Sequence, residues 1–283
     1  MSIRILSPAV QQRIAAGEVI ERPASVVKEL TENALDAAAN IIRVEIQEGG
    51  RRLIKVTDDG SGMSAADVPL AFERFATSKI VSENDIHAVR TFGFRGEALP
   101  SIASVSRLRL LTREHTALLG TEARIEGGKL VSLQEAGAAV GTTVEAWDLF
   151  YNIPARRQFL RSLRTEYGHI LGTFTRFSLA FPEKNLSLYF DGREVYTFPP
   201  TSLSERITAC FGREAASGLE EFDSTGIVGR VWGVALSTEG VWRRRYYFFV
   251  NRRPVRNRTL YRAVRDTLQG EGGMVFVFLD LHP

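Results

Sequence analysis

Cysteine and lysine are both scarce in this 283-residue sequence, and each scarcity says something about its chemistry. Cys210 is the single cysteine, which rules out an internal disulfide and a zinc site made of several thiolates, and predicts a reducing, cytoplasmic setting. Most of the 36 basic residues are arginines, because lysine occurs only at Lys28, Lys55, Lys79, Lys129 and Lys184. The planar guanidinium group suits bidentate contacts with phosphate, although a GC-rich genome would produce the same bias.

Long apolar runs are also missing. No run approaches the ~18 residues that cross a bilayer, and the first residues, MSIRILSPAVQQRIAAGEV, lack the apolar stretch and cleavage site of a secretory signal. Hydrophobic residues still make up 44% of the chain, charged residues make up 24% and the net charge is +3. These values predict a soluble protein with one large domain or two ordinary ones.

The order of apolar periods and breaks along the chain predicts an α+β protein. Helices are predicted over residues 23–39, 65–76, 165–180, 203–211 and 257–269. A β-hairpin is predicted over 41–60, and further strands are predicted over 105–112, 121–126, 130–134, 142–147, 185–190, 226–236, 245–251 and 274–281. Residues 77–98 have the composition of a long functional loop. The stretch TFPPTS at 197–202 is the predicted linker between residues 1–200 and 201–283.

The helix predicted over 23–39 carries an unusual polar face. At about 100° per residue, the side chains of Glu29, Glu32, Asn33 and Asp36 fall within an arc of roughly 100°. Asn33 places a neutral oxygen among carboxylates, a mixture that suits Mg²⁺ with retained waters and substrate phosphates. The alternative interpretation is the solvated acidic face of an ordinary amphipathic helix.

Two glycine-rich turns strengthen the interpretation of a phosphate site. DDGSG at 58–62 follows a predicted strand, where ligands of α/β proteins collect, and TFGFRGE at 91–97 has glycines that let backbone N–H groups approach phosphate. No P-loop motif is present. GSGMSA at 60–65 fits a dinucleotide-binding pattern, but two aspartates before its first glycine would place negative charge against a pyrophosphate.

These stretches resemble the four motifs of the gyrase/Hsp90/histidine-kinase/MutL ATPase superfamily. The motifs, in order, are the helix with Glu29 and Asn33, DDGSG at 58–62, GFRGEAL at 93–99 and GTT at 141–143. Other stretches resemble the MutL branch of DNA mismatch-repair ATPases in particular: IAAGEV at 14–19, RPASVVKEL at 22–30, ATSK at 76–79 and DLFYNIPARR at 148–157. The resemblance implies an ATP-binding α/β sandwich, a mixed sheet covered by helices, followed by a smaller α/β domain similar to ribosomal protein S5.

The resemblance also implies roles for single residues. Glu29 is expected to be the catalytic general base that activates water, and Asn33 is expected to hold Mg²⁺ against the phosphates of ATP. Asp58 is expected to accept a hydrogen bond from the adenine amino group, with support from Thr143. The remaining nucleotide-binding residues that the resemblance implies are Gly60, Gly62, Thr77, Lys79, Gly93, Phe94, Arg95 and Gly96. Gly96 is expected to open a helix, and residues 76–98 are expected to form a lid that ATP orders.

The region after the linker is dense in arginine. Nine arginines and no acidic residue lie between positions 241 and 265, interleaved with tyrosine and tryptophan. The resemblance places this region in the S5-like domain and implies weak, sequence-independent binding of DNA. The arginines proposed for that role are Arg252, Arg253, Arg256, Arg258, Arg262 and Arg265. The alternative is a solvated basic face.

The expected function is thus a slowly hydrolysing ATP switch of DNA mismatch repair that forms a homodimer when ATP binds. The implied partners are DNA, mismatch-recognition proteins and downstream repair proteins, with a nucleoid-associated location during repair and no membrane. A lysine that contacts the γ-phosphate in the family would follow His282-Pro283, so the chain is expected to be part of a longer protein with low activity. The alternatives are the ATPase portion of a type II topoisomerase subunit and a DNA-binding module that ignores nucleotide.

Overall fold

The computed structural model describes most of the chain and shows two compact units. The described residues are 4, 16–17, 19–79, 91–93, 95–213, 218–237, 245–267 and 273–281. The first unit comprises Met1–Phe174 and Asn185–Thr197, and the second comprises Thr175–Lys184 and Phe198–Pro283. The chain therefore passes into the second unit for the last time within the stretch that the sequence marks as a linker. In the described part of the chain, no helix is long and apolar enough to span a membrane.

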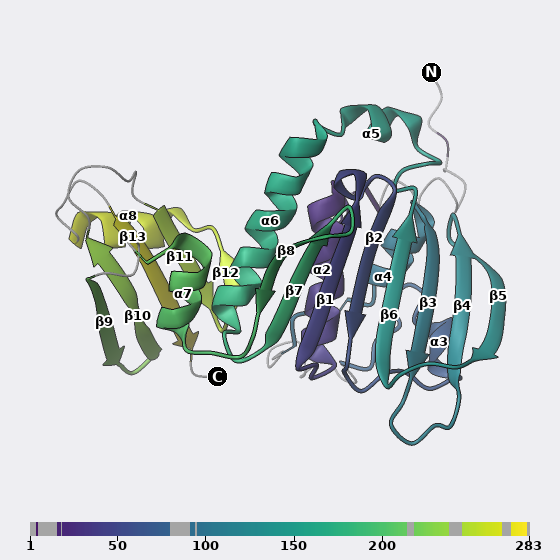
Figure 1. Ribbon diagram of the computed structural model, residues 1–283, viewed down its shortest axis with the longest axis horizontal. Coiled ribbons are helices and arrows are strands. Elements are labelled where there is room, and N and C mark those ends of the chain that lie inside the picture. Colours follow the sequence, from purple (N-terminus) through teal and green to yellow (C-terminus); the bar gives the residue numbers. More distant parts are fainter. Residues whose placement is uncertain are drawn as a thin grey trace. The chain divides into compact units, whose positions relative to one another are not determined.

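The first unit is built on one eight-stranded mixed sheet (Figure 1). Its strands run in the order β5-β4-β3-β6-β2-β1-β7-β8, and β1 pairs with β2 in antiparallel and with β7 in parallel orientation. The strands are β1 (Ile41–Gln47), β2 (Leu53–Asp58), β3 (Arg107–Arg113), β4 (Gly120–Glu126), β5 (Lys129–Ala136), β6 (Gly141–Trp147), β7 (Asn185–Phe190) and β8 (Arg193–Phe198).

Helices cover one face of this sheet, and α2 (Pro23–Asp36) is the one that positions polar residues (Figure 1). Proline at its first position has the φ that a helix start requires. Val26, Val27 and Leu30 are buried against β1 and β2, and each such side chain contributes about 1.5–3 kcal/mol of hydrophobic stabilisation. This anchored apolar stripe fixes which way the polar stripe of α2 faces.

The other helices of the first unit are shorter or lie beside α2. The short helix α3 (Asp67–Leu70) and α4 (Ala98–Ser104) contact β4, and α4 also contacts β3 and α2. A single 3-10 turn, η1 (Glu48–Gly50), joins β1 to β2, and α5 (Pro154–Phe159) precedes the long helix α6 (Leu163–Ala180). The last residues of α6, from Thr175 onward, belong to the second unit.

The second unit contains a five-stranded sheet whose central strand is buried on both faces. Its order is β12-β11-β13-β10-β9, with β11 parallel to β13. Residues 273–278 of the central strand β13 are buried in succession, which is the pattern of a strand covered on both sides. The elements are α7 (Leu203–Phe211), β9 (Leu219–Thr225), β10 (Gly229–Ser237), β11 (Arg245–Val250), β12 (Arg253–Val255), α8 (Arg258–Thr267) and β13 (Gly273–Leu281).

The predicted α+β fold, with a large mixed sheet covered by helices and a smaller second unit, is confirmed. The helix predicted over 65–76 is wrong, because only Asp67–Leu70 is helical and Phe75 takes a left-handed conformation at φ 65°. This break turns the chain so that the Phe75 N–H donates to the carbonyl of Gly96. The sequence patterns also missed α5, β8, β9 and β12, which are short or largely exposed.

Candidate functional site

The polar face of α2 forms one wall of the candidate site. Glu29 lies in the second turn with 22% of its side chain exposed, and Lys28 Nζ donates to its Oε1 at 2.8 Å. Lys28 also bridges to Glu32 Oε2 at 2.8 Å, one helical turn later. Glu29 is thus accessible to solvent and has a cation beside it.

Asn33 and Asp36 continue the same stripe and bind Lys79 together. Lys79 Nζ lies 2.6 Å from Asp36 Oδ2 and 3.3 Å from Asn33 Oδ1. The backbone N–H groups of Phe92 and Gly93 also donate to Asp36, at 2.8 and 3.0 Å. Only 4% of the Asp36 side chain is exposed. The structure therefore gathers three residues that the sequence assigned to phosphate or Mg²⁺, and the carboxylate that joins them is one to which the sequence gave no role.

Asp58 lies at the end of β2 and is held by one of its two carboxylate oxygens. The N–H groups of Gly60 and Thr142 donate to Oδ1 at 2.9 and 3.3 Å. No described residue donates to Oδ2, which leaves that oxygen as an open acceptor. Burial raises the pKa of Asp58 from 3.8 to about 6, against the lowering effect of the two N–H groups.

The glycines of the turn after Asp58 are required by its packing. Gly62 has φ +71°, and a Cβ at this position would lie 2.1 Å from the carbonyl oxygen of Arg113. A Cβ on Gly60 would lie 2.8 Å from Ala37, where α2 ends. The Ser61 N–H donates to the Ala37 carbonyl at 2.9 Å, which ties the turn to α2. Asp58, the carboxylate predicted to bind adenine, and the helix with Glu29 are thus parts of one rigid wall.

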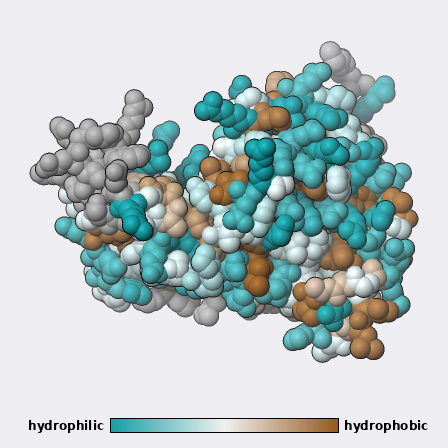
Figure 2. Space-filling model, viewed as in Figure 1, coloured by the Kyte–Doolittle hydropathy of each residue, from teal (hydrophilic) through white to brown (hydrophobic). Residues whose placement is uncertain are grey.

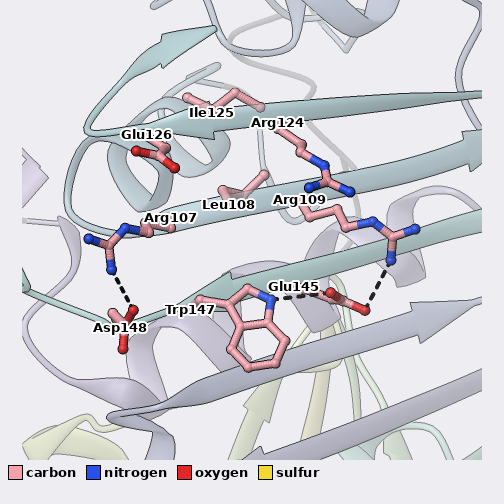
Figure 3. A pocket seen from close by; sticks show the side chains of 9 residues that line it. All are labelled: Arg107, Leu108, Arg109, Arg124, Ile125, Glu126, Glu145, Trp147 and Asp148. Atoms are coloured by element: carbon pink, nitrogen blue, oxygen red, sulfur yellow. Dashed lines mark hydrogen bonds and ion pairs between the residues drawn. The ribbon is translucent and has the colours of Figure 1, made fainter. Parts of the chain in front are cut away.

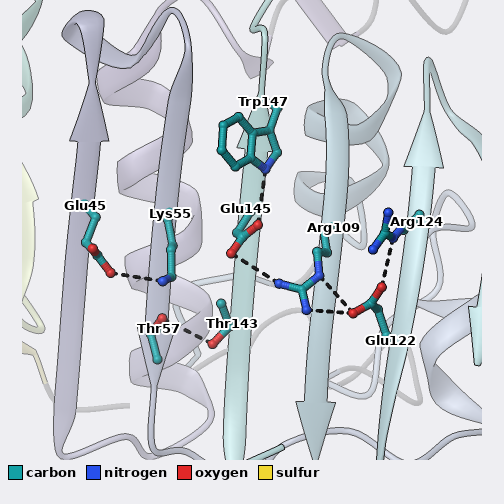
Figure 4. Close-up of polar contacts among 9 residues, drawn as sticks. All are labelled: Glu45, Lys55, Thr57, Arg109, Glu122, Arg124, Thr143, Glu145 and Trp147. Carbon is teal, nitrogen blue, oxygen red and sulfur yellow. Dashed lines mark hydrogen bonds and ion pairs between the residues drawn. The ribbon is translucent and has the colours of Figure 1, made fainter. Parts of the chain in front are cut away.

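Thr143, which the resemblance expects to support Asp58, lies beside Thr57 in the sheet. Thr142 is the register partner of Asp58, and its hydroxyl lies 2.9 Å from that of the buried Thr112. Thr143 is the register partner of Thr57, and the two hydroxyls lie 3.2 Å apart on the opposite face of the sheet (Figure 4). Because side chains alternate along a strand, the geometry brings Thr142 toward Asp58. The contribution of Thr143 to nucleotide binding remains a prediction.

The loop before α4 is partly described. Gly93 packs closely on Lys79, because a Cβ added to this glycine would lie 3.4 Å from Lys79 Nζ. The backbone N–H of Lys79 donates to Thr77 Oγ1 at 3.1 Å. Gly96 has φ +59° and packs on the backbone of Ala76, and α4 begins two residues later, at Ala98. The side chain of Arg95 is exposed. Phe94 and residues 80–90, which the predicted lid includes, lie outside the described residues.

The residues that would hold Mg²⁺ already hold a cation. The ammonium group of Lys79 lies between the amide oxygen of Asn33 and the carboxylate of Asp36. Oxygen atoms of these types are the ligands that Mg²⁺ takes when substrate phosphates and waters complete its shell. Among the described residues no group of three or more His, Cys, Asp and Glu side chains forms a metal centre. Asn33 is therefore a fitting single ligand for a metal carried in with phosphates.

The opposite face of the sheet is also polar, but its charges are paired with one another. Arg109 contacts both Glu122, at 2.6 Å, and Glu145, at 3.3 Å, and Arg124 contacts Glu122 at 2.8 Å (Figure 4). A hollow of about 500 Å³ beside them is lined on its edges by Trp147 and polar side chains (Figure 3). Figure 2 shows mostly hydrophilic residues over this face. Cross-strand ion pairs of this kind are typical of a solvated sheet surface.

In the second unit the arginines assigned to DNA have different surroundings. Arg252 pairs with Glu183, and Arg265 pairs with Asp266 at 2.8 Å. Arg256 is exposed. Burial, and after it the charge of Arg256, lowers the pKa of Arg176. The remaining residues of the set lie on β12 or on the exposed face of α8, namely Arg253, Arg258 and Arg262. Arg243 and Arg244 lie outside the described residues.

The comparisons with known proteins agree with this geometry. Residues 18–146 match the family described as histidine kinase-, DNA gyrase B-, and HSP90-like ATPase. The chain is 48% identical, over 99% of its length, to the DNA mismatch repair protein MutL of Opitutus terrae, and 44% identical, over 99%, to that of Geobacter sulfurreducens. It spans 46% and 48% of those proteins, which is about half of their length.

A solved structure covers almost the whole chain. The Aquifex aeolicus MutL ATPase domain complexed with ADP is 33% identical, with a TM-score of 0.71 over 94% of each chain. Together with the sequence relatives, this match favours MutL over a topoisomerase subunit. The chain belongs to the MutL family of DNA mismatch repair proteins and corresponds to the portion that contains their ATPase domain.

Proposed function

We propose that this chain binds ATP between α2 and the turns at 58–62 and 91–97 and hydrolyses it slowly, as the switch of a mismatch-repair protein. The observation that carries the proposal is the open Oδ2 of Asp58 on the same rigid wall as the cluster of Asn33, Lys79 and Gly93. At one end of this wall, Asp58 Oδ2 offers an acceptor for the adenine amino group. At the other end, the ammonium group of Lys79 offers donors for phosphate. The related Aquifex aeolicus domain was solved with ADP.

The hydrolytic step is assigned to Glu29. Its carboxylate lies on the exposed edge of α2, one helical turn before Asn33. Glu29 takes a proton from the water that attacks the terminal phosphorus, and the bond from that phosphorus to the bridging oxygen breaks, so that ADP leaves. Asn33 would hold Mg²⁺, which would neutralise charge on the phosphates when bound. Gly93, Phe94, Arg95 and Gly96 surround the phosphates, with Thr77 and Lys79 at the entry of the lid.

Two substitutions on this wall test the assignment, because they act on different steps. Glu29→Ala is expected to lower turnover by ~10²–10⁴-fold and to leave ATP affinity nearly unchanged, since a base acts on water and not on adenine. Asp58→Asn is expected to weaken binding, because an amide can present a donor to the adenine amino group. Equilibrium binding and single-turnover hydrolysis distinguish the two. A Glu29→Ala protein that lost affinity but kept turnover would contradict the assignment.

ATP also drives the assembly of the chain in this proposal. Residues 76–98 close over bound ATP, and the first 20 residues then pack on a second copy to give a two-fold dimer. The base of this N-terminal segment is fixed, because Arg156 donates to the carbonyls of Gly17, at 2.8 Å, and Ile20, at 3.1 Å. Sedimentation with a non-hydrolysable ATP analogue and Mg²⁺ tests the dimer, and a sedimentation coefficient that stays monomeric contradicts it.

The second unit binds DNA through phosphate contacts in this proposal. Arg256, Arg258 and Arg262 offer guanidinium groups for which no described residue supplies an acidic partner. A hollow of about 500 Å³ between β11 and α8 lies beside two of them and is lined by Tyr246 and Tyr261. Contacts between guanidinium groups and DNA phosphates contribute to affinity but do not distinguish one base sequence from another. Mismatch-recognition and downstream repair proteins are the further partners proposed for the complete protein.

A further inference from the structure

Asp36 is the most fully engaged side chain of the candidate site, and no role has been given to it above. Its carboxylate accepts from Lys79 Nζ at 2.6 Å, from the Phe92 N–H at 2.8 Å and from the Gly93 N–H at 3.0 Å. These donors come from two segments that flank residues 80–90: Lys79 immediately precedes them, and Phe92 and Gly93 follow shortly after. One buried carboxylate thus joins both ends of the predicted lid to the end of α2.

This position is an unfavourable one for a carboxylate unless its partners compensate. Asp36 is the last residue of α2, where the helix dipole is negative and repels an anion. Its side chain is only 4% exposed, so water does little to stabilise the charge. Three donors, one of them charged, offset both effects. Because the protein keeps a carboxylate here despite the helix dipole and the burial, we expect this side chain to do more than end the helix.

We propose that Asp36 is a positioning residue for phosphate binding. By fixing Lys79 Nζ and the backbone at Phe92 and Gly93, it holds a charged donor and the start of the glycine-rich turn beside the place where the phosphates bind. The proposal rests on the proposed function, because Lys79 and Gly93 were assigned there to phosphate. It adds that their geometry is set by a side chain that never touches the nucleotide. Asp36 has no contact with the turn that holds Asp58 in the described contacts, so adenine recognition is independent of it.

The experiment compares the affinities of ATP and of adenosine for the wild-type chain and for Asp36→Asn. Asparagine keeps the size of the side chain but turns one acceptor toward Lys79 or a loop N–H into a donor. We expect the Kd for ATP to rise about tenfold or more, while the Kd for adenosine, which has no phosphate, changes by about twofold or less. Lys79→Met should give a similar loss, and the double variant should be no weaker than Lys79→Met alone, because the two residues act as one unit.

Asp191→Asn is the matched control. Asp191 also accepts from a backbone N–H, that of Glu48 at 2.9 Å, and from a side chain, the hydroxyl of Tyr167, but it lies in the turn between β7 and β8. The Asp191→Asn substitution should lower the melting temperature without changing the ratio of ATP affinity to adenosine affinity. Equal losses for both ligands in Asp36→Asn would mean a purely structural role, and tighter ATP binding would mean that Asp36 competes with phosphate. Either result overturns the proposal.

Amide hydrogen exchange without ligand separates this proposal from the proposed function. Asp36→Asn should speed exchange at Phe92 and Gly93 and leave the interior of α2 unchanged. If the wild-type chain bound neither ATP nor adenosine, the proposed function would fail, and the exchange rates would still decide whether Asp36 fixes the loop. Unchanged exchange at Phe92 and Gly93 would overturn the positioning role even in a chain that binds ATP.

Discussion

Asp58 carries a carboxylate whose two oxygens have different surroundings. Oδ1 receives the N–H groups of Gly60 and Thr142, so a proton that binds to the side chain goes to Oδ2. Burial raises the pKa of this carboxyl to about 6. Protonation therefore converts the oxygen proposed for adenine from an acceptor into a donor, in a range of pH that is easily reached in solution.

Adenosine affinity should consequently fall with decreasing pH below about 6, by about tenfold per unit of pH once the carboxyl is mostly protonated. Adenosine is the suitable ligand because it lacks the phosphates that titrate in the same range. Calorimetric titrations between pH 5 and 7.5 measure the effect, and the affinity of Asp58→Asn should be nearly flat across that range. An affinity of the wild-type chain that does not change with pH would argue against Asp58 as the adenine acceptor.

The raised pKa of Asp58 also makes the stability of the fold depend on pH, in the direction opposite to that of adenosine affinity. The folded-state pKa of about 6 lies above the ordinary value of 3.8, so the folded chain binds this proton more tightly than the unfolded chain does. The contribution of Asp58 to stability is thus fully present below about pH 4 and is lost as the pH rises through about 6. Adenine binding and folding therefore favour different protonation states of one residue, as expected for a group placed for function.

Residue roles could be predicted from sequence only where a motif names the residue. Glu29, Asn33 and Asp58 stand in the sequence beside recognisable glycines or on a periodic polar face, and the structure brings them to one wall. The contact of the Thr142 N–H with Asp58 was not predicted, because it depends on strand register, which the resemblance did not supply. The role of Asp36 depends on Lys79 and Gly93, which are 43 and 57 residues away, and no local pattern shows such a contact.

Whole elements were predicted best where their periodicity is long and their burial is one-sided. The pattern of α2 and the β1–β2 hairpin follows directly from alternating buried and exposed side chains. Strand β9, by contrast, has no fully buried residue and contains LEEFDST, so hydrophobic alternation gives no signal there. The end of α3 was misjudged because the later turns serve a tertiary contact with Gly96 and not a local preference.

The turn after β2 gives a prediction at the scale of an element. Gly62→Ala places a side chain at φ +71° and 2.1 Å from the Arg113 carbonyl oxygen, so it should lower the free energy of unfolding by about 2 kcal/mol or more. Gly137→Ala is the control, because nothing lies within 4 Å of its Cβ position. Urea unfolding should give little change for Gly137→Ala. Equal stabilities of the two variants would show that the turn can rearrange freely.

At the scale of the whole molecule, two units of different chemistry share one chain. The first has its ion pairs arranged so that charges on the open sheet face neutralise one another, as in Arg109 with Glu122 and Glu145. The second concentrates exposed arginines on α8 and in the residues that flank β12. An isolated cluster of like charges repels itself and is relieved by an anionic partner. The exposed arginines of the second unit are therefore the groups that the proposed DNA contacts would use.

DNA binding by this chain should be weak, independent of base sequence and strongly dependent on salt. If about four arginines contact phosphates, the slope of log affinity against log salt should be roughly −3 to −4. Replacing Arg256 and Arg262 by glutamine should make that slope less steep by about 2 and weaken all sequences alike, while ATP affinity stays the same. Arg52 and Arg124 of the first unit, whose side chains are 60% and 58% exposed, provide the matched control pair.

The same titrations can be repeated with a non-hydrolysable ATP analogue, because a dimer would bring two arginine surfaces to one DNA. DNA should then bind more tightly to the nucleotide-bound chain, and by linkage the analogue should bind more tightly in the presence of DNA by the same factor. A slope near zero, a marked preference for one base sequence, or an equal loss in the control pair would each contradict phosphate binding by the second unit. In that case the arginines of α8 and β12 form a solvated basic face, and the partner that relieves their repulsion is not DNA.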